Sequence, residues 1–391
     1  MTDALNQLEE LAAGGIAHAR FAHGVEIQSD DFAAVDRILA KERLTLALND
    51  SEMLAACYGA WAGMWAVKNL NACWVGLHEP CSPRLLVGGV TCSPIDAVKR
   101  LLTESSSRTS LTSMQKQMQA WAQRAAKSSD ATSINAAAWD RLAEDNRFAG
   151  EIPLPRDRQS AIAALDPWLA ADWLWLTRAG RPRCRLLCLG AGGGRQGPLH
   201  AIAGAEVTVV DISARQLDHD RRVAAKHGLA LTLHQSSADR LDGLRSASFD
   251  VVVQPVSACY LPDICNMYRE ISRVLRPGGI YLVQHKHPMS MILKPSPAGD
   301  YTISEQAIQG LPLPVRSESD DHANSAQEPG TVEYSHSLQT LIGELCAAGF
   351  VITHFAEPIR ADAFALPGTA EHRACFAPPY FKLKALNQLK Q

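Results

Sequence analysis

The feature that most constrains the fold is an alternation of apolar strands and amphipathic helices across residues 183–287. Strands are expected at residues 183–190, 205–211, 229–235, 249–255 and 279–285. Helical stretches with polar faces separate them, including residues 214–226 and 263–276. Buried strands that alternate with such helices are typical of a parallel sheet covered on both faces, so the pattern predicts an α/β fold.

The chain after residue 287 predicts the rest of this sheet. A Pro/Ser/Asp-rich stretch at 295–330 is too long for an ordinary connection and is interpreted as a substrate lid. A helix is expected at 337–349, followed by two late strands at 350–358 and 380–386. The larger predicted domain therefore covers residues 131–391.

The first 130 residues have a different pattern and predict a small α+β domain. Helices are expected at 31–48 and 52–68, with Asp50 and Ser51 as a cap of the second one. Two short β-rich segments follow, and Ser93 then precedes a helix that begins with Pro94. The Ser/Thr-rich segments around 103–113 and 128–133 are the predicted linkers.

The role of residues 1–130 stays open between a lid over the substrate, an oligomer surface that would give a homodimer, and a docking module. The tryptophans Trp61, Trp65 and Trp74 could belong to a cofactor site, but they are interpreted as a local core.

Composition excludes several functional classes. The 391 residues are 47% apolar with a formal net charge of −3, which favours an ordinary globular protein of two or three folding units. Nucleic-acid binding would require a basic surplus, and a membrane span would require a longer apolar run. The acidic start of the chain does not resemble an export signal, so its ten scattered cysteines are expected to be reduced in the cytoplasm. No metal site is predicted.

A glycine cluster carries the strongest functional signal. The strand that ends at Leu189 runs directly into Gly190-Ala-Gly-Gly-Gly194, and glycines there let backbone N–H groups approach a ligand closely. The next predicted strand ends in Asp211, whose carboxylate can accept hydrogen bonds from both ribose hydroxyls of a nucleoside. The combination predicts a nucleoside site at the carboxyl ends of the strands.

Two nucleotide motifs do not fit. The dinucleotide fingerprint requires a glycine at the position of Arg195, and the triphosphate loop G-x-x-x-x-G-K-[ST] is absent.

The segments LGAGGG, VVDIS, SFDVVVQPVSACYLPD and REISRVLRPGGIYLV together resemble the class I S-adenosylmethionine-dependent methyltransferases, most closely the small-molecule branch that includes ubiquinone-type enzymes. The resemblance is strong over residues 183–287 and extends more weakly to residue 391. It implies a Rossmann-like, mostly parallel seven-stranded sheet with an antiparallel last strand, S-adenosylmethionine as cofactor, and a small-molecule acceptor methylated on oxygen, nitrogen or carbon.

The resemblance also implies a set of cofactor-binding residues. Gly190, Ala191, Gly192 and Gly193 would line the methionine moiety and ribose, Asp211 would hold the ribose hydroxyls, and Ile212 would pack on the adenine. After the third strand, Ser237 and Ala238 occupy the family's adenine positions, and either Ser237 or Asp239 would meet the adenine amine. Gln254, Pro255 and Val256 would face the transferred methyl group.

Candidate catalytic residues lie at the end of the fifth strand. His285 and His287 flank Lys286 where ligands sit in open α/β sheets, and the pKa of an imidazole suits a general base. Tyr260 is interpreted either as a substrate contact or as a core residue. More distant candidates, for which a solvated surface position is the favoured interpretation, are His322, Glu333, His336 and His372.

The sequence therefore predicts a methyltransferase. A non-catalytic sensor that binds S-adenosylmethionine or S-adenosylhomocysteine is an alternative that the glycine loop fits equally well. A nicotinamide-dependent oxidoreductase is a third hypothesis, against which Arg195 counts.

Overall fold

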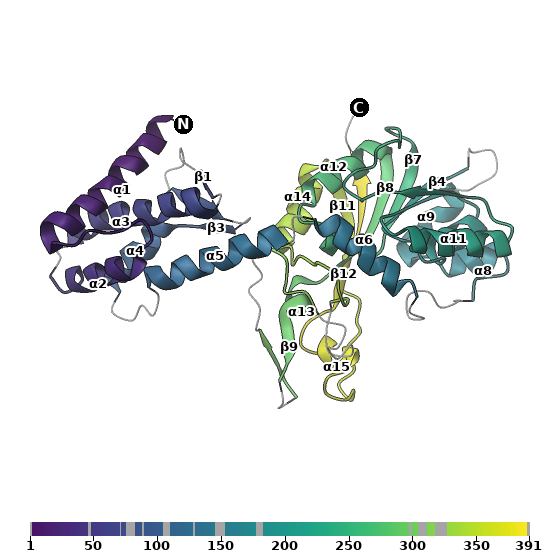
Figure 1. Cartoon of the computed structure of the whole chain (residues 1–391). Helices are drawn as coiled ribbons and strands as arrows, with labels where there is room; N and C mark the ends of the chain where they lie inside the picture. The colour runs from purple at the N-terminus through teal and green to yellow at the C-terminus, as the bar shows by residue number, and fades with distance from the viewer. Residues whose placement is uncertain are drawn as a thin grey trace. The chain divides into compact units, whose positions relative to one another are not determined.

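The chain divides into two compact units in the computed structural model, residues 1–129 and residues 130–391 (Figure 1). The structure describes residues 2–45, 48–70, 72–75, 83–87, 90–104, 110–127, 130–144, 153–176, 183–296, 299–303, 311–316 and 327–388.

The first unit is a set of helices with a small antiparallel sheet. Its helices are α1 (Thr2–His23), α2 (Phe32–Glu42), α3 (Leu48–Leu70), α4 (Pro94–Thr103) and α5 (Leu111–Lys127). Its strands are β1 (Cys73–Val75), β2 (Arg84–Val87) and β3 (Val90–Cys92), paired in the order β1-β2-β3. The Ser93 hydroxyl accepts a hydrogen bond from the Asp96 N–H at 3.2 Å, which confirms the predicted cap of α4.

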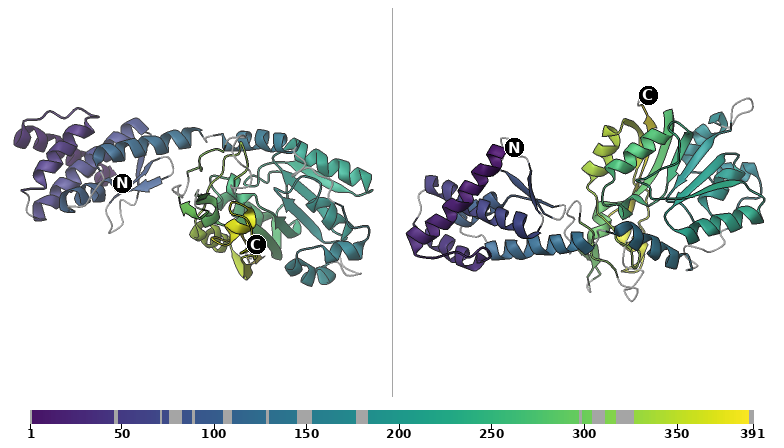
Figure 2. Two further views of the ribbon diagram at one scale, coloured as in Figure 1. Left: turned by 90° about the horizontal axis from the view of Figure 1, so that it is seen from below. Right: turned by 45° about the horizontal axis from the view of Figure 1, so that its top comes forward.

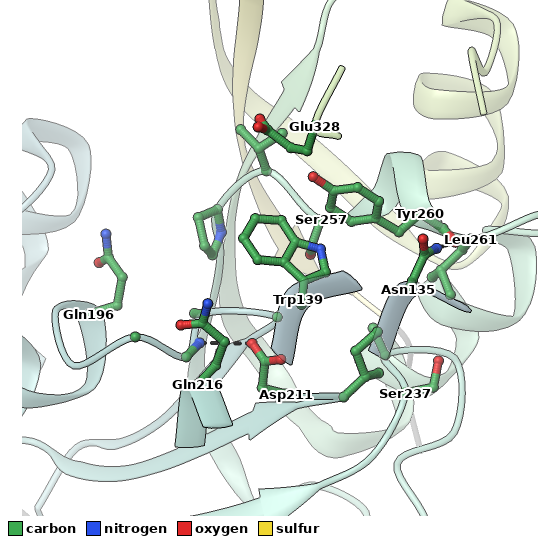
Figure 3. A pocket seen from close by; sticks show the side chains of 18 of the residues that line it. Asn135, Trp139, Gln196, Asp211, Gln216, Ser237, Ser257, Tyr260, Leu261 and Glu328 are labelled. Atoms are coloured by element: carbon green, nitrogen blue, oxygen red, sulfur yellow. Dashed lines mark hydrogen bonds between the residues drawn. The ribbon is translucent and has the colours of Figure 1, made fainter. Parts of the chain in front are cut away.

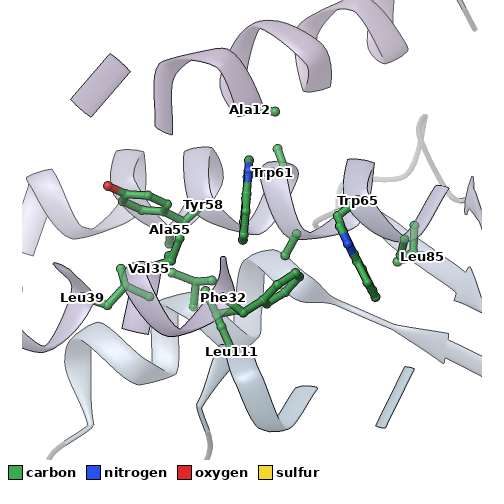
Figure 4. Close-up of a cluster of buried hydrophobic side chains, with 14 of the residues drawn as sticks. Ala12, Phe32, Val35, Leu39, Ala55, Tyr58, Trp61, Trp65, Leu85 and Leu111 are labelled. Atoms are coloured by element: carbon green, nitrogen blue, oxygen red, sulfur yellow. The ribbon is translucent and has the colours of Figure 1, made fainter. Parts of the chain in front are cut away.

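Aromatic side chains fill the core of this unit (Figure 4). Phe32 of α2 packs against the indoles of Trp61 and Trp65, with ring centroids 4.7 and 5.0 Å apart. Trp74 is buried in the same cluster, so the prediction that these tryptophans form a local core is confirmed. The predicted start of α3 is wrong, because the helix begins at Leu48 and Asp50 therefore lies inside its first turn.

The second unit is built on a seven-stranded sheet with the order β11-β12-β8-β7-β4-β5-β6. The strands are β4 (Arg185–Leu189), β5 (Glu206–Asp211), β6 (Leu231–Gln235), β7 (Phe249–Gln254), β8 (Leu275–Lys286), β11 (Phe350–Ala356) and β12 (Tyr380–Asn387). Strands β4 to β8 pair in parallel, and β12 is antiparallel to both β8 and β11. The predicted Rossmann-like α/β fold class with an antiparallel last strand is confirmed.

Helices cover both faces of this sheet (Figures 1 and 2). One face packs against α12 (Cys265–Val274), the π-helical turn η3 (Gln339–Gly343) and α14 (Glu344–Ala347). The other face packs against α8 (Arg158–Ala163), α9 (Pro167–Leu176), α10 (Gln196–Ile202) and α11 (Ala214–Lys226). Residues that alternate along β4 and β7 contribute to the two clusters in turn, as a sheet buried on both faces requires.

Smaller elements complete the unit at the carboxyl ends of the strands. They are α6 (Ala131–Leu142), the 3₁₀ turn η1 (Ala258–Tyr260), α13 (Pro288–Ile292), α15 (Ala370–Ala374) and the hairpin of β9 (Leu293–Pro295) with β10 (Tyr301–Ile303). The predicted lid at 295–330 falls partly on this hairpin, but residues 297–298, 304–310 and 317–326 lie outside the described ones. Among the described helices, none is both long and apolar enough to cross a membrane.

Candidate functional site

A cavity of about 390 Å³ lies at the carboxyl ends of the parallel strands (Figure 3). The loops that follow β4, β5, β6 and β7 contribute to it, together with the last residue of β8 and with α6. Its lining residues are Thr132, Asn135, Trp139, Gly190, Ala191, Gly192, Gly193, Arg195, Gln196, Asp211, Ile212, Gln216, Ser236, Ser237, Ala238, Pro255, Val256, Ser257, Tyr260, Leu261, Lys286, Glu328 and Tyr380. Open parallel sheets bind their ligands at this edge.

The glycine loop after β4 has no room for side chains. Gly190 has φ +56°, and a Cβ there would lie 2.5 Å from the Ser257 hydroxyl. A Cβ at Gly192 would lie 2.7 Å from the Gln216 Cβ and 3.0 Å from an Asp211 oxygen. The loop therefore presents bare backbone to the cavity, which is the arrangement that close ligand approach needs.

Asp211 ends β5 and points to the glycine loop (Figure 3). Its Oδ2 accepts a hydrogen bond from the Gly192 N–H at 2.9 Å, and its Oδ1 accepts one from the Ser213 N–H, also at 2.9 Å. Burial raises the pKa of this carboxyl group, although the two N–H groups oppose the shift. The carboxylate lines the cavity beside Ile212.

A second acid behind the loop was missed from the sequence. Asp220 of α11 is fully buried, and its Oδ2 accepts a hydrogen bond from the Gly193 N–H at 3.0 Å. Burial raises the pKa of Asp220 to about 7. Its Oδ1 has no hydrogen-bond partner in the described part of the chain. Asp220 supports the loop without lining the cavity, and its sequence signal is one acid within a helix of mostly polar residues.

Gln216, one turn earlier on α11, was also missed. It lines the cavity, and its buried Oε1 has no hydrogen-bond partner among the described residues. Buried polar atoms are almost always satisfied, so an unsatisfied acceptor beside a glycine loop fits a ligand that brings a donor.

Of the three residues predicted to meet the adenine from the loop after β6, only two line the cavity. Ser237 and Ala238 line the cavity, whereas Asp239 does not. The Asp239 carboxylate instead accepts a hydrogen bond from the Ser237 hydroxyl, and its carbonyl accepts one from the Asn266 side chain. The sequence left open which of the two side chains meets a ligand, and the geometry favours Ser237.

The end of β7 shows a similar division. Pro255 and Val256 line the cavity together with Ser257. Gln254 is buried behind them, where its amide donates to the Ser257 hydroxyl at 2.8 Å and its carbonyl accepts from the Tyr281 hydroxyl. Gln254 therefore positions Ser257 rather than facing the cavity.

Lys286 is the cation at the far end of the cavity. It is the last residue of β8, and its side chain is 3% exposed. Its Nζ donates to Glu333 Oε2 at 2.8 Å and lies 3.9 Å from Glu328 Oε1. Burial lowers the pKa of Lys286, but Glu333, Cys259 and Glu328 together outweigh burial and raise this pKa above its ordinary value. Lys286 is therefore a permanent cation and not a base.

The two glutamates around Lys286 differ in exposure. Glu333 is fully buried, and its Oε1 accepts hydrogen bonds from the Glu328 N–H at 2.8 Å and from the Thr331 hydroxyl at 3.1 Å. The Glu328 side chain is 27% exposed and lines the cavity. Glu333 thus neutralises Lys286, and Glu328 adds a carboxylate at the cavity surface.

Aromatic rings form the wall next to these charges (Figure 3). The Trp139 and Tyr260 rings meet edge to face with centroids 5.6 Å apart, and Lys286 Nζ lies 5.6 Å from the Tyr260 centroid. Asn135 fixes this wall: its amide donates to the carbonyls of Tyr260 and Val332, and its own carbonyl accepts from the Val332 N–H at 2.7 Å. A ring-shaped ligand would find aromatic surface to pack against here.

The two predicted histidines do not line the cavity. His285 is 2% exposed, faces the Tyr268 hydroxyl at 3.3 Å, and burial lowers its pKa to about 3. The Nδ1 of His287 accepts a hydrogen bond from the Met289 N–H and caps α13. Side chains alternate along a strand, so Lys286 faces the ligand edge and its neighbours do not. The general-base prediction for both histidines has no support in this geometry.

The four more distant candidate residues differ in their positions. Glu333 and His336 are buried, so the surface interpretation is wrong for them. The Nε2–H of His336 donates a hydrogen bond to the Leu261 carbonyl at 2.9 Å. His372 lies beside Tyr301, away from the cavity, and His322 lies outside the described residues.

Comparisons with known proteins agree with this geometry. Residues 187–283 match the family described as "Methyltransferase domain". The uncharacterized methyltransferase YbaJ of Bacillus subtilis is 32% identical over 179 residues, which is 44% of this chain and 68% of that protein. The ubiquinone biosynthesis O-methyltransferase of Aromatoleum aromaticum is 31% identical over 106 residues, 27% of this chain and 45% of that enzyme.

A solved structure is similar as well. The S-adenosylmethionine-dependent methyltransferase from Mesorhizobium loti is 24% identical, with a TM-score of 0.42, and the alignment covers 57% of this chain and 99% of that one.

Proposed function

Because the chain belongs to the class I S-adenosylmethionine-dependent methyltransferases, we propose that its cavity binds a small planar acceptor with a hydroxyl or amine group beside the cofactor. The family and the cofactor predicted from the glycine loop are confirmed. The sensor and oxidoreductase alternatives gain no support from these relatives. The acceptor, the site residues and the division of labour between the two units are the proposal.

The residues at the glycine end fit an adenosyl sulfonium. The carboxylate of Asp211 would accept from the ribose hydroxyls, and the unsatisfied Oε1 of Gln216 would accept from the amine of the methionine moiety. Ser237 would meet the adenine amine. When bound, the cofactor supplies an electrophilic methyl group on sulfur.

The single observation that carries the acceptor proposal is the arrangement of Lys286, Glu328 and the aromatic wall. A hydroxyl or amine nucleophile must lose a proton, and the Glu328 carboxylate is the acidic side chain at that end of the lining. The fixed charge of Lys286 stabilises negative charge that develops on the nucleophile. Trp139 and Tyr260 hold the ring of the acceptor and exclude water.

The remaining parts of the proposal concern the whole chain. Residues 130–391 carry the catalysis, and a lid role for the segment 295–330 stays a prediction. Nucleic acid is not the acceptor, since the net charge is −3. The cytoplasm is the proposed compartment because the described cysteines are free thiols. A homodimer through residues 1–130 stays a prediction.

The test is a turnover assay with S-adenosylmethionine and a panel of small aromatic hydroxyl and amine compounds, followed by mass spectrometry of S-adenosylhomocysteine and of the methylated product. With an accepted compound, Glu328→Gln is expected to lower kcat by about 100-fold, as for loss of a general base, while affinity for S-adenosylmethionine is unchanged. The matched control is Glu357→Gln, which removes an exposed carboxylate beside His287. Full turnover by Glu328→Gln would refute the base role.

A further inference from the structure

Three ligand-type side chains meet in the first unit, far along the chain from the methyltransferase match at 187–283. His18 and His23 lie on α1, and Glu42 is the last residue of α2. One nitrogen or oxygen atom from each lies within 4.8 Å of the others. We propose that His18, His23 and Glu42 bind a divalent transition-metal ion of the zinc type, independently of the proposed function.

Both imidazoles direct the same ring atom at the carboxylate. His18 Nε2 lies 3.5 Å from Glu42 Oε1, and His23 Nε2 lies 2.6 Å from that same oxygen. Ligands of a tetrahedral zinc ion, each about 2.0–2.2 Å from the metal, lie roughly 3.3–3.5 Å apart. The His18 separation already matches. At His23 the ion would replace a hydrogen bond, which needs a shift of less than about 1 Å at the end of a flexible glutamate.

A third helix orients the ring of His18. The hydroxyl of Tyr58, on α3, lies 3.0 Å from His18 Nδ1, and Tyr58 is fully buried. Metal-binding histidines typically use one ring nitrogen for the metal and donate the other N–H to an oxygen, which fixes the tautomer. Tyr58 supplies such an oxygen, so Nε2 of His18 is left to face Glu42.

The exposure of the cluster suits an exchangeable ion. The side chains of His18, His23 and Glu42 are 25%, 12% and 14% exposed. They are shielded enough to hold a fixed geometry, and His18 leaves a solvent path to the ion. Three protein ligands leave a fourth position for water, and two imidazoles with one carboxylate suit zinc or iron rather than the all-oxygen ligand sets of calcium and magnesium.

The competing interpretation is a simple hydrogen-bonded His23–Glu42 pair. Glu42→Gln separates the two, because a glutamine carbonyl still accepts from the imidazole N–H but is a much poorer metal ligand.

The experiment is calorimetric titration of the full chain with Zn²⁺, after alkylation of the exposed thiols, since thiolates also bind zinc. Co²⁺ is the spectroscopic probe. One equivalent is expected to bind, with visible cobalt bands and without thiolate charge-transfer bands. His18→Gln, His23→Gln and Glu42→Gln should each weaken binding by at least about tenfold, and Tyr58→Phe by about tenfold.

Glu52→Gln is the matched control, an exposed glutamate on α3 that pairs with Lys99. Circular dichroism of each variant verifies that it is folded. No saturable binding, unchanged affinity in Glu42→Gln, or a cobalt spectrum with thiolate bands would each overturn the proposal. Binding of Mg²⁺ with equal affinity would do so too.

Discussion

The two ends of the cavity are built in different ways. At the cofactor end, backbone N–H groups of one glycine loop face two acids, Asp211 and Asp220, on adjacent elements. At the acceptor end, Trp139, Lys286 and Glu328 come from segments that are far apart in the sequence. The cofactor end is thus a local motif, whereas the acceptor end exists only after folding. This difference explains why a sequence pattern can indicate the cofactor end but not the acceptor end.

The largest expected effect is a loss of stability when the buried ion pair at the acceptor end is broken. Lys286→Met leaves Glu333 buried without its cation, and removal of one partner of a buried pair costs about 3–5 kcal/mol of unfolding free energy. Urea unfolding of the purified variants measures it. The double variant Lys286→Met/Glu333→Gln should regain part of the loss, and Lys226→Met, at an exposed position, should lose little. A stability equal to wild type in Lys286→Met would show that the charges are not coupled.

The next effect concerns the acid behind the glycine loop. Because burial raises the pKa of Asp220 in the folded state to about 7, the protonated form is favoured by folding. Its contribution to stability is complete below the unfolded pKa near 3.8 and is lost as pH rises through about 7. Asp220→Asn should therefore gain about 2–4 kcal/mol relative to wild type between about pH 4 and about pH 7.5. Unfolding at several pH values measures this, with Asp218→Asn as the exposed control; a pH-independent difference would contradict it.

A somewhat smaller effect is expected for ligand binding at the cofactor end. Asp211→Ala removes a carboxylate that would bond two ribose hydroxyls, so the affinity for S-adenosylmethionine should fall by more than about tenfold. Calorimetric titration measures the change. Asp218→Ala on α11 serves as control, because its side chain is half exposed. Unchanged affinity in Asp211→Ala would remove the ribose assignment.

The smallest effect belongs to a residue that the sequence singled out. His285 does not reach the cavity, so His285→Gln should change kcat by less than about threefold and leave its pH profile unaltered. If His285→Gln removed one titration step from the pH profile of kcat, His285 would be the general base. The two ends of the cavity would then not differ in the way described above.

The sequence predicted the sheet and the cofactor end for a physical reason. Buried strands appear in the sequence as runs of β-branched residues. A loop that must approach a ligand closely appears as a cluster of glycines at a characteristic distance before Asp211. Both signals are patterns along the chain itself. Asp220 and Gln216 were missed because α11 is rich in polar residues, and its sequence does not show which of them turn toward the glycine loop.

The acceptor end could not be predicted in the same way. The sequence placed function at the end of β8 but chose His285 and His287 instead of Lys286 between them. The choice depends on which face of the strand meets the cavity, and that is set by the tilt and pairing of β8 with β7 and β12. Glu328 lies in a stretch for which the sequence predicted neither a helix nor a strand, so nothing in its neighbourhood indicated a position beside Lys286.

The three hydrogen bonds of Asn135 determine how long a segment of the chain must be to form a complete site. Through them α6 holds the carbonyl of Tyr260 and the backbone of Val332 from a point some fifty residues before β4. A gene fusion or exchange that transferred only residues 187–283 would deliver a nucleoside pocket with one side missing. The functional module therefore begins at α6, so we expect a transferred segment to need residues from about 130 onward as well as the family match at 187–283.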